Sequence, residues 1–221
     1  MHGLAAQVLI AVEGDILRFA LAEMVRGMPG YSLRGVAADA ATAIMAMRSH
    51  TLDVLLLDVV LAEKMKAAFG GHGTHPRVLL FSPHRHIGLD AACAMDCACG
   101  FVRERAPLRH IQAVSRIVAS CDVPAAGKSK RCQACPLRPS LVPASLPLSP
   151  REQEVFARIG AGESNQAIAK ALGLSVKTVE CHRESCKRKL GLNSAAQLLA
   201  AAVAWRAGDY VPDHVDALSR Q

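Results

Sequence analysis

Residues 173–191 read GLSVKTVECHRESCKRKLG, and this stretch decides the fold of the C-terminal part of the chain. Ser175 stands where a side-chain oxygen can cap a helix, and the helical pattern after it runs to about Leu190. Gly173 precedes the serine and supplies the tight turn that lets two helices cross. The stretch therefore predicts a helix entered through a sharp turn from another helix.

Two shorter helices are predicted before that turn. Ser149, Pro150 and Glu152 form a helix start, because the serine can cap, proline is tolerated at the first position, and the glutamate completes a capping box. Gly160 and Gly162 end this helix, and Ser164 begins the next. The residues expected to be buried on these two helices are Val155, Phe156, Ile159, Ile168 and Leu172.

The helix that Ser175 opens has two different faces. Val176, Val179, Cys186 and Leu190 recur at helical spacing and are expected to face the core. The side chains left outward are Lys177, Thr178, Glu180, Cys181, Arg183, Glu184, Lys187 and Arg188. Such a helix fits the major groove of DNA, with its N-terminal half on base edges and its cations on phosphates. The alternative is an ordinary solvated helix face.

Residues 148–207 resemble the DNA-binding domain of the LuxR/NarL family. The resemblance implies that the helix after Ser175 recognises DNA, with Lys177, Thr178 and Arg183 at positions that contact backbone or bases. Glu180, Cys181 and Glu184 would then choose the sequence. A fourth helix, Ser194–Trp205, serves many members as a dimer contact. The residues expected to supply that contact are Leu198, Leu199 and Val203, for which burial inside the domain is the alternative.

The first 120 residues alternate apolar runs with helical patterns. Strands are expected at Val8–Val12, Leu33–Ala37, Val54–Asp58, Val78–Phe81 and Phe101–Val102. Helices are expected at Ile16–Met28, Ala40–Arg48, Leu89–Met95 and Leu108–Ser120. This alternation predicts an α/β fold, a doubly wound (βα)5 parallel sheet with helices on both faces, followed by the all-α, four-helix helix-turn-helix domain.

The N-terminal half resembles a response-regulator receiver domain, and by that resemblance Asp58 is the phosphoacceptor candidate. Glu13 stands for the pair of acids that bind Mg²⁺, so one acid is missing, and Asp15 lies two residues further on. Ser82 supplies the expected hydroxyl, but Glu104 falls where receivers place a lysine. The missing acid weakens the case for Mg²⁺, and a glutamate would repel an aspartyl-phosphate. The alternative for Asp58 is an acid in a scaffold that no longer takes phosphate.

Composition sets the domain limits and the class of partner. The chain has 221 residues, a formal charge of +7 and a pI near 9.2, which suits a polyanionic partner. Five prolines between Asp122 and Pro147 predict an extended tether. The expected domains are 1–121 receiver-like and degenerate, 122–147 linker, 148–208 DNA-binding and 209–221 tail. With no export signal and no apolar run near 20 residues, the expected location is cytoplasmic, with no membrane contact.

Four cysteines are candidates for a metal or redox site. Cys132 and Cys135 form a CxxC pair, and Cys97 and Cys99 lie near the fifth strand. A CxxC pair can reach one zinc ion, four thiols can hold an iron–sulfur cluster, and two thiols can close a regulatory disulfide. The alternative is that these cysteines are small core or linker residues.

The sequence therefore predicts a transcriptional regulator that is not an enzyme. Its expected partners are double-stranded DNA and a second copy of the chain, with a sensor histidine kinase as a further candidate. The receiver-like domain would control dimerisation or DNA access. The alternative function is a transcription factor whose cysteines sense thiol redox state or a metal.

Overall fold

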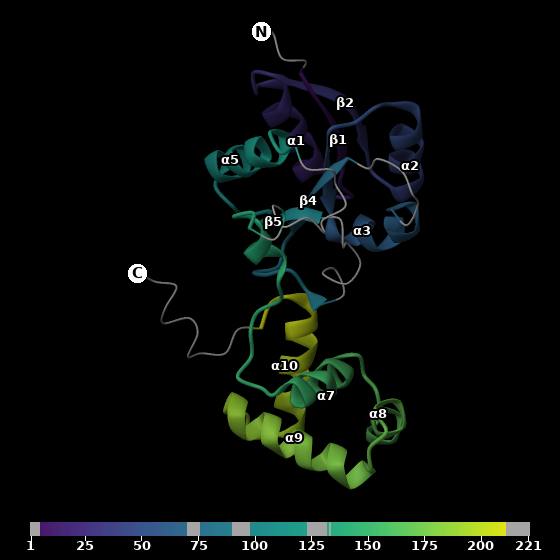
Figure 1. Ribbon diagram of the computed structural model, residues 1–221, viewed down its shortest axis with the longest axis vertical. Helices are drawn as coiled ribbons and strands as arrows, with labels where there is room; N and C mark the ends of the chain where they lie inside the picture. The colour runs from purple at the N-terminus through teal and green to yellow at the C-terminus, as the bar shows by residue number, and fades with distance from the viewer. Residues whose placement is uncertain (1–4, 70–75, 90–97, 123–131, 133, 211–221) are drawn as a thin grey trace. The chain divides into compact units, whose positions relative to one another are not determined.

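A computed structural model describes residues 5–69, 76–89, 98–122, 132 and 134–210 (Figure 1). The chain divides into two compact units, Met1–Val142 and Pro143–Gln221. Within the described ranges, no helix combines the length and apolar character needed to cross a bilayer.

The N-terminal unit is built on a five-stranded parallel sheet with the order β2-β1-β3-β4-β5. The strands are β1 (Ala6–Ala11), β2 (Tyr31–Ala37), β3 (Val54–Asp58), β4 (Arg77–Ser82) and β5 (Ala98–Arg103). All five residues of β3 are buried, because this strand is central and both of its faces are covered. The predicted sheet is confirmed, and β5 is longer than its sequence suggested.

Helices cover both faces of the sheet, with α1 and α5 on one and α2 and α3 on the other (Figure 1). Their bounds are α1 (Asp15–Arg26), α2 (Ala40–Ser49), α3 (Val59–Met65) and α5 (Leu108–Ala119), with the 3-10 turn η1 (Lys66–Phe69) after α3. The helical pattern of α3 was missed, because apolar residues run straight from β3 into it. The helix predicted at Leu89–Met95 lies outside the described residues after Leu89.

Part of the predicted tether is packed rather than extended. The 3-10 turn η2 (Arg138–Leu141) lies against β5, where the Phe101 amide donates to the Ser140 hydroxyl at 3.0 Å. Leu137 packs on Gly100, where an added Cβ would approach the Leu137 side chain to 3.3 Å. The prolines shape a turn that covers an edge strand, so proline content alone is a poor measure of extension.

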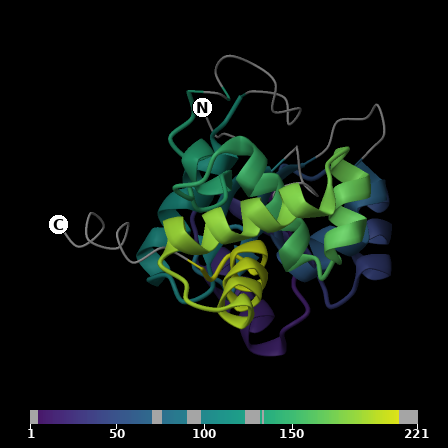
Figure 2. The ribbon, with the colours of Figure 1, turned by 90° about the horizontal axis from the view of Figure 1, so that it is seen from below.

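Over its described residues, 143–210, the C-terminal unit contains four helices: α7 (Pro150–Gly160), α8 (Asn165–Leu172), α9 (Val176–Leu190) and α10 (Ala195–Ala207). Phe156 of α7 and Trp205 of α10 meet in its core with ring centroids 5.7 Å apart. The Trp205 indole also donates to the Ala144 carbonyl at 2.9 Å, which ties the segment before α7 to this unit. In Figure 2, α9 is a long rod in the foreground of its unit.

Candidate DNA-binding interface

Side-chain caps and glycines set the bounds of α8 and α9. The Ser164 hydroxyl accepts from the Ala167 amide at 3.2 Å, and the Ser175 hydroxyl accepts from the Thr178 amide at 3.0 Å. Gly173 ends α8 with a φ of +66°, a left-handed conformation that favours glycine. The turn between α8 and α9 lies between Gly173 and the Ser175 cap, and these two residues fix the direction of α9.

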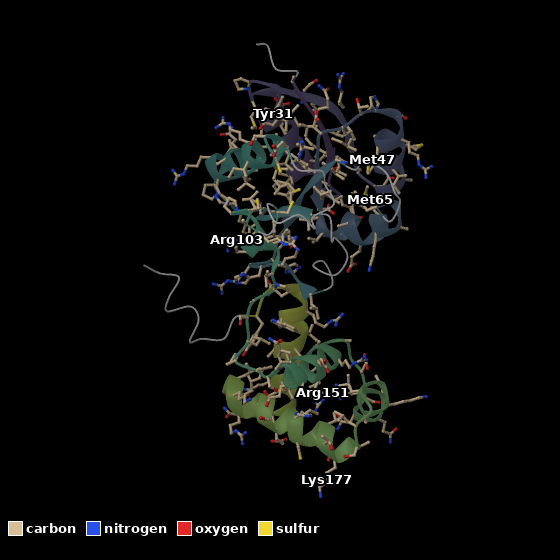
Figure 3. The ribbon with its side chains drawn as sticks, in the orientation of Figure 1. Tyr31, Met47, Met65, Arg103, Arg151 and Lys177 are labelled. Carbon is tan, nitrogen blue, oxygen red and sulfur yellow. The ribbon has the colours of Figure 1, made fainter. Side chains whose placement is uncertain are left out.

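The outward face of α9 has the predicted character. Lys177, Glu180, Cys181, Glu184 and Arg188 are exposed, whereas Thr178, Arg183 and Lys187 are half-buried. Figure 3 shows Lys177 projecting outward from the N-terminal end of α9. Lys187 Nζ lies 2.9 Å from Glu184 Oε1, so part of its charge is used within the helix. The exposed N-terminal half therefore presents a lysine, an acid and a thiol to any partner.

The inward face of α9 matches the prediction with one exception. Val179, Cys186 and Leu190 are buried, but Val176 is 39% exposed. Val176 is the first residue of the helix, beside the exposed Ser175 and Lys177, so the prediction that it faces the core is wrong. Burial raises the pKa of the Cys186 thiol to about 12, and the charge of Glu152 acts in the same direction. Cys186 is therefore a packing residue without thiolate chemistry at neutral pH.

A buried carboxylate joins α7 to α9. Glu152 accepts from the Ser149 amide at 2.7 Å as the second half of the capping box, and from the Ser185 hydroxyl at 2.7 Å. Lys189 Nζ lies 2.6 Å from the same carboxylate. The ammonium of Lys189 lowers the pKa of Glu152 to about 2, with help from the Ser149 amide and against the cost of burial. The capping box was predicted, but this link was not, because residues 152 and 189 are far apart in sequence.

The three predicted dimer residues of α10 differ in their exposure to solvent. Leu198 is 0% exposed and belongs to the core of the unit, so its assignment to a dimer contact is corrected. Leu199 and Val203 are 45% and 48% exposed. Residues 198 and 199 point in different directions because neighbours in a helix are rotated by about 100°. Of these three residues, Leu199 and Val203 are available to a partner and Leu198 is not.

In the N-terminal unit, the Asp58 carboxylate is engaged by backbone amides. Its Oδ1 accepts from the Leu61 amide at 2.7 Å, which caps α3, and its Oδ2 accepts from the Glu13 amide at 2.6 Å. The residue is 5% exposed. Asp58 therefore fixes the start of α3 and the loop after β1, whatever else it does.

Among the described residues near Asp58, Asp15 does not supply an unpaired second acid, and Glu104 stands where receivers place a lysine. Glu13 Oε1 lies 3.0 Å from Lys64 Nζ of α3, and Asp15 pairs with Arg18, so neither acid is free of a cation. Ser82 is buried and its hydroxyl accepts from the His84 amide at 3.2 Å. Burial raises the pKa of Glu104, and the charge of Asp58 raises it further. The structure thus places two carboxyls close enough to repel each other.

Comparisons with known proteins agree with this two-unit architecture. A family model described as bacterial regulatory proteins, luxR family, matches residues 146–202. The probable transcriptional regulatory protein NarL of Mycobacterium tuberculosis (strain H37Rv) is 31% identical over 177 residues, covering 78% of this chain and 82% of the relative. The chain belongs to the LuxR/NarL family of DNA-binding transcriptional regulators. The Fimbriae Z protein of Salmonella typhimurium is 26% identical over 202 residues, covering 88% of this chain and 94% of the relative.

A solved structure of another regulator has the same fold as this LuxR/NarL family member. RcsB from Salmonella enterica serovar Typhimurium, bound to promoter P1flhDC, matches with a TM-score of 0.52 and 19% identity. The match covers 91% of this chain and 98% of that chain. At this identity the likeness establishes the fold alone, an α/β unit followed by a helical unit.

The four candidate cysteines of this LuxR/NarL protein are described in part. Cys97 lies outside the described residues, whereas Cys99, Cys132 and Cys135 are half-buried. Burial raises the pKa of Cys99 to about 11, and the neighbouring Cys121 and Cys132 act in the same direction. Among the residues the structure describes, no three His, Cys, Asp or Glu side chains are grouped to hold a metal ion. The predicted zinc, iron–sulfur and disulfide alternatives stay predictions.

Proposed function

We propose that α9 is the DNA-recognition helix of this regulator and that two copies of the chain bind one specific duplex site. The observation that supports this most strongly is that α9 has an outward polar face, a start capped by Ser175 and a last turn held to α7 by Lys189 and Glu152. Because α9 is already formed and held at both ends, binding in a groove would not include the free-energy cost of ordering the helix.

The side chains of α9 divide into two proposed roles. Lys177, Thr178 and Arg183 would contact phosphates or base edges, while Glu180, Cys181 and Glu184 would select the sequence. Lys187 and Arg188 would add attraction for the phosphate backbone. Residues 149–207 contain nine Lys or Arg and five Asp or Glu, a net charge of +4, which favours approach to a polyanion.

A homodimer is proposed because α10 leaves two apolar side chains uncovered. Leu199 and Val203 are four residues apart, so they lie on the same face of α10 and form one apolar strip. Pairing two copies through this strip would remove it from water. The dimer would read two half-sites about one helical turn of DNA apart.

The N-terminal unit is proposed to control dimerisation or DNA access through a population shift between two states of the chain. Asp58 remains the phosphoacceptor candidate, with Glu13, Ser82 and Glu104 as its neighbours. Because Glu104 brings a negative charge where receivers place a lysine, phosphorylation by a sensor kinase would work against repulsion. An input other than phosphate is therefore the better expectation for this unit.

Selection of bound duplexes from a random pool tests the DNA-binding proposal with the full chain. The selected sequence is expected to contain two related half-sites, and Lys177→Ala or Arg183→Ala is expected to weaken binding about ten-fold. Lys66→Ala is the matched control, because it removes the same charge from an exposed turn of the other unit. Equal affinities of Lys177→Ala, Arg183→Ala and Lys66→Ala would refute the assignment of α9.

A further inference from the structure

A cleft of about 410 Å³ opens in the N-terminal unit at the carboxyl ends of β4 and β5. Its lining includes four basic side chains, Arg85, His86, Arg103 and His110. The lining also includes Pro139, within η2, and Val142, directly after η2. Figure 3 labels Arg103 at the end of β5. The volume lies within the range of pockets that take small molecules.

The cleft exists because η2 lies across the end of β5. The hydrogen bond from the Phe101 amide to Ser140 holds the turn in place, and the Ser140 hydroxyl donates to the Leu137 carbonyl at 2.6 Å. Gly100 lets Leu137 approach the strand closely. The positions of Pro139 and Val142 therefore depend on a few contacts between η2 and one edge strand.

The charges around the cleft favour an anion. Two of the residues that line it are arginines and two are histidines, and none is an aspartate or glutamate. The α5 helix begins at this cleft after Pro107, with no side-chain cap and no acid in its first turn. The positive end of the helix dipole therefore adds to the charge of Arg103.

We infer that this cleft binds a small organic anion, in which a carboxylate or phosphate pairs with Arg103 and His110 and an apolar body lies against Pro139 and Val142. A guanidinium can form two parallel hydrogen bonds with either group. The site is separate from the Asp58 carboxylate, because neither Asp58 nor Glu104 lines the cleft. Binding here requires nothing of the DNA-binding unit.

Occupancy of the cleft would also reach the output of the protein. Val142 is the last residue of the N-terminal unit, and Pro143 begins the unit that contains α9. A ligand held between β5 and η2 would fix the chain just before that boundary. This second step, unlike the binding itself, rests on the proposed function.

Ligand-observed NMR with the full chain tests the site, using phenyl phosphate, benzoate and benzyl alcohol as probes. Phenyl phosphate or benzoate is expected to bind about ten-fold more tightly than the neutral alcohol, and comparing the two anions separates phosphate from carboxylate recognition. Arg103→Ala is expected to lower the affinity of the preferred anion about ten-fold. Arg105→Ala, which removes an exposed arginine outside the cleft, is expected to leave it unchanged.

Val142→Asp provides a second variant, since Val142 is exposed and its replacement leaves the core intact. Its added charge is expected to repel the anion. The site is overturned if no probe binds, if benzyl alcohol binds as well as the anions, or if Arg103→Ala binds like Arg105→Ala. DNA affinity measured with and without the preferred anion tests the second step. An unchanged DNA affinity would overturn that coupling and leave the site in place.

Discussion

Lys189 Nζ of α9 lies 2.6 Å from the buried Glu152 carboxylate of α7, which also closes the capping box at the start of α7. The Glu152 side chain therefore both caps the start of α7 and anchors α9 against it. The Glu152 side chain is 7% exposed and the Lys189 side chain 38%, so water and salt reach the pair from the lysine side only. The contact joins the first turn of α7 to the last turn of α9.

Glu152→Gln is expected to destabilise the C-terminal unit by on the order of 2 kcal/mol at pH 7. The pKa of Glu152 is about 2 in the folded chain and 4.5 in its reference state, so the lowered pKa stabilises the fold above pH 4.5. This stability is lost as pH falls from 4.5 toward 2, and the variant and the parent should converge there. Urea unfolding at several pH values measures the difference.

Glu154→Gln is the matched control for Glu152→Gln. Glu154 is on the same helix and pairs with Arg151, but the side chains are 53% and 37% exposed. Such a surface pair contributes less than about 1 kcal/mol. Equal losses in the two variants would contradict the anchoring role of Glu152.

Glu104→Gln is expected to raise stability at neutral pH. Burial and the charge of Asp58 raise the pKa of Glu104 in the folded chain, so its ionised form costs stability above that pKa. The gain should shrink as pH falls through the raised pKa of Glu104 and vanish below its ordinary value of 4.5, where Glu104 is protonated in both states. Urea unfolding midpoints of the parent and the variant, measured at neutral and at acidic pH, give the sign of the stability difference. A variant less stable than the parent at neutral pH would show that Glu104 has a favourable partner instead.

Local signals in the sequence were enough for much of this structure. Ser149, Ser164 and Ser175 each cap the helix predicted for them, because a cap depends on residues only three positions apart. The links between Lys189 and Glu152 and between Ser140 and Phe101 could not be predicted, because they join residues brought together by the fold. The cleft beside Arg103 was missed for the same reason.

Leu198 and Leu199 are expected to respond in opposite ways to substitution. Leu198→Ala should cost about 2–5 kcal/mol of stability, because Leu198 is fully buried. Leu199→Lys should leave the unfolding midpoint nearly unchanged and shift the chain from dimer to monomer. Calorimetry and sedimentation of both variants check this. A dimer that persists in both Leu199→Lys and Val203→Lys would exclude this strip of α10 as the interface.

Gly160→Ala is expected to destabilise the C-terminal unit by about 2 kcal/mol through overpacking. A Cβ at Gly160 would lie 2.5 Å from the Ala202 carbonyl oxygen and 2.8 Å from its carbon, so the backbones of α7 and α10 would have to separate. The sequence suggested only that Gly160 ends α7, but the close approach of α10 gives it a second role. Gly27→Ala is the control, since a Cβ there makes ordinary contacts of 3.5 and 3.6 Å and the backbone is right-handed. Replacing a glycine reduces the flexibility of the unfolded chain, which by itself would raise the thermal midpoint of both variants. A midpoint that falls for Gly160→Ala but not for Gly27→Ala would therefore identify the clash with α10.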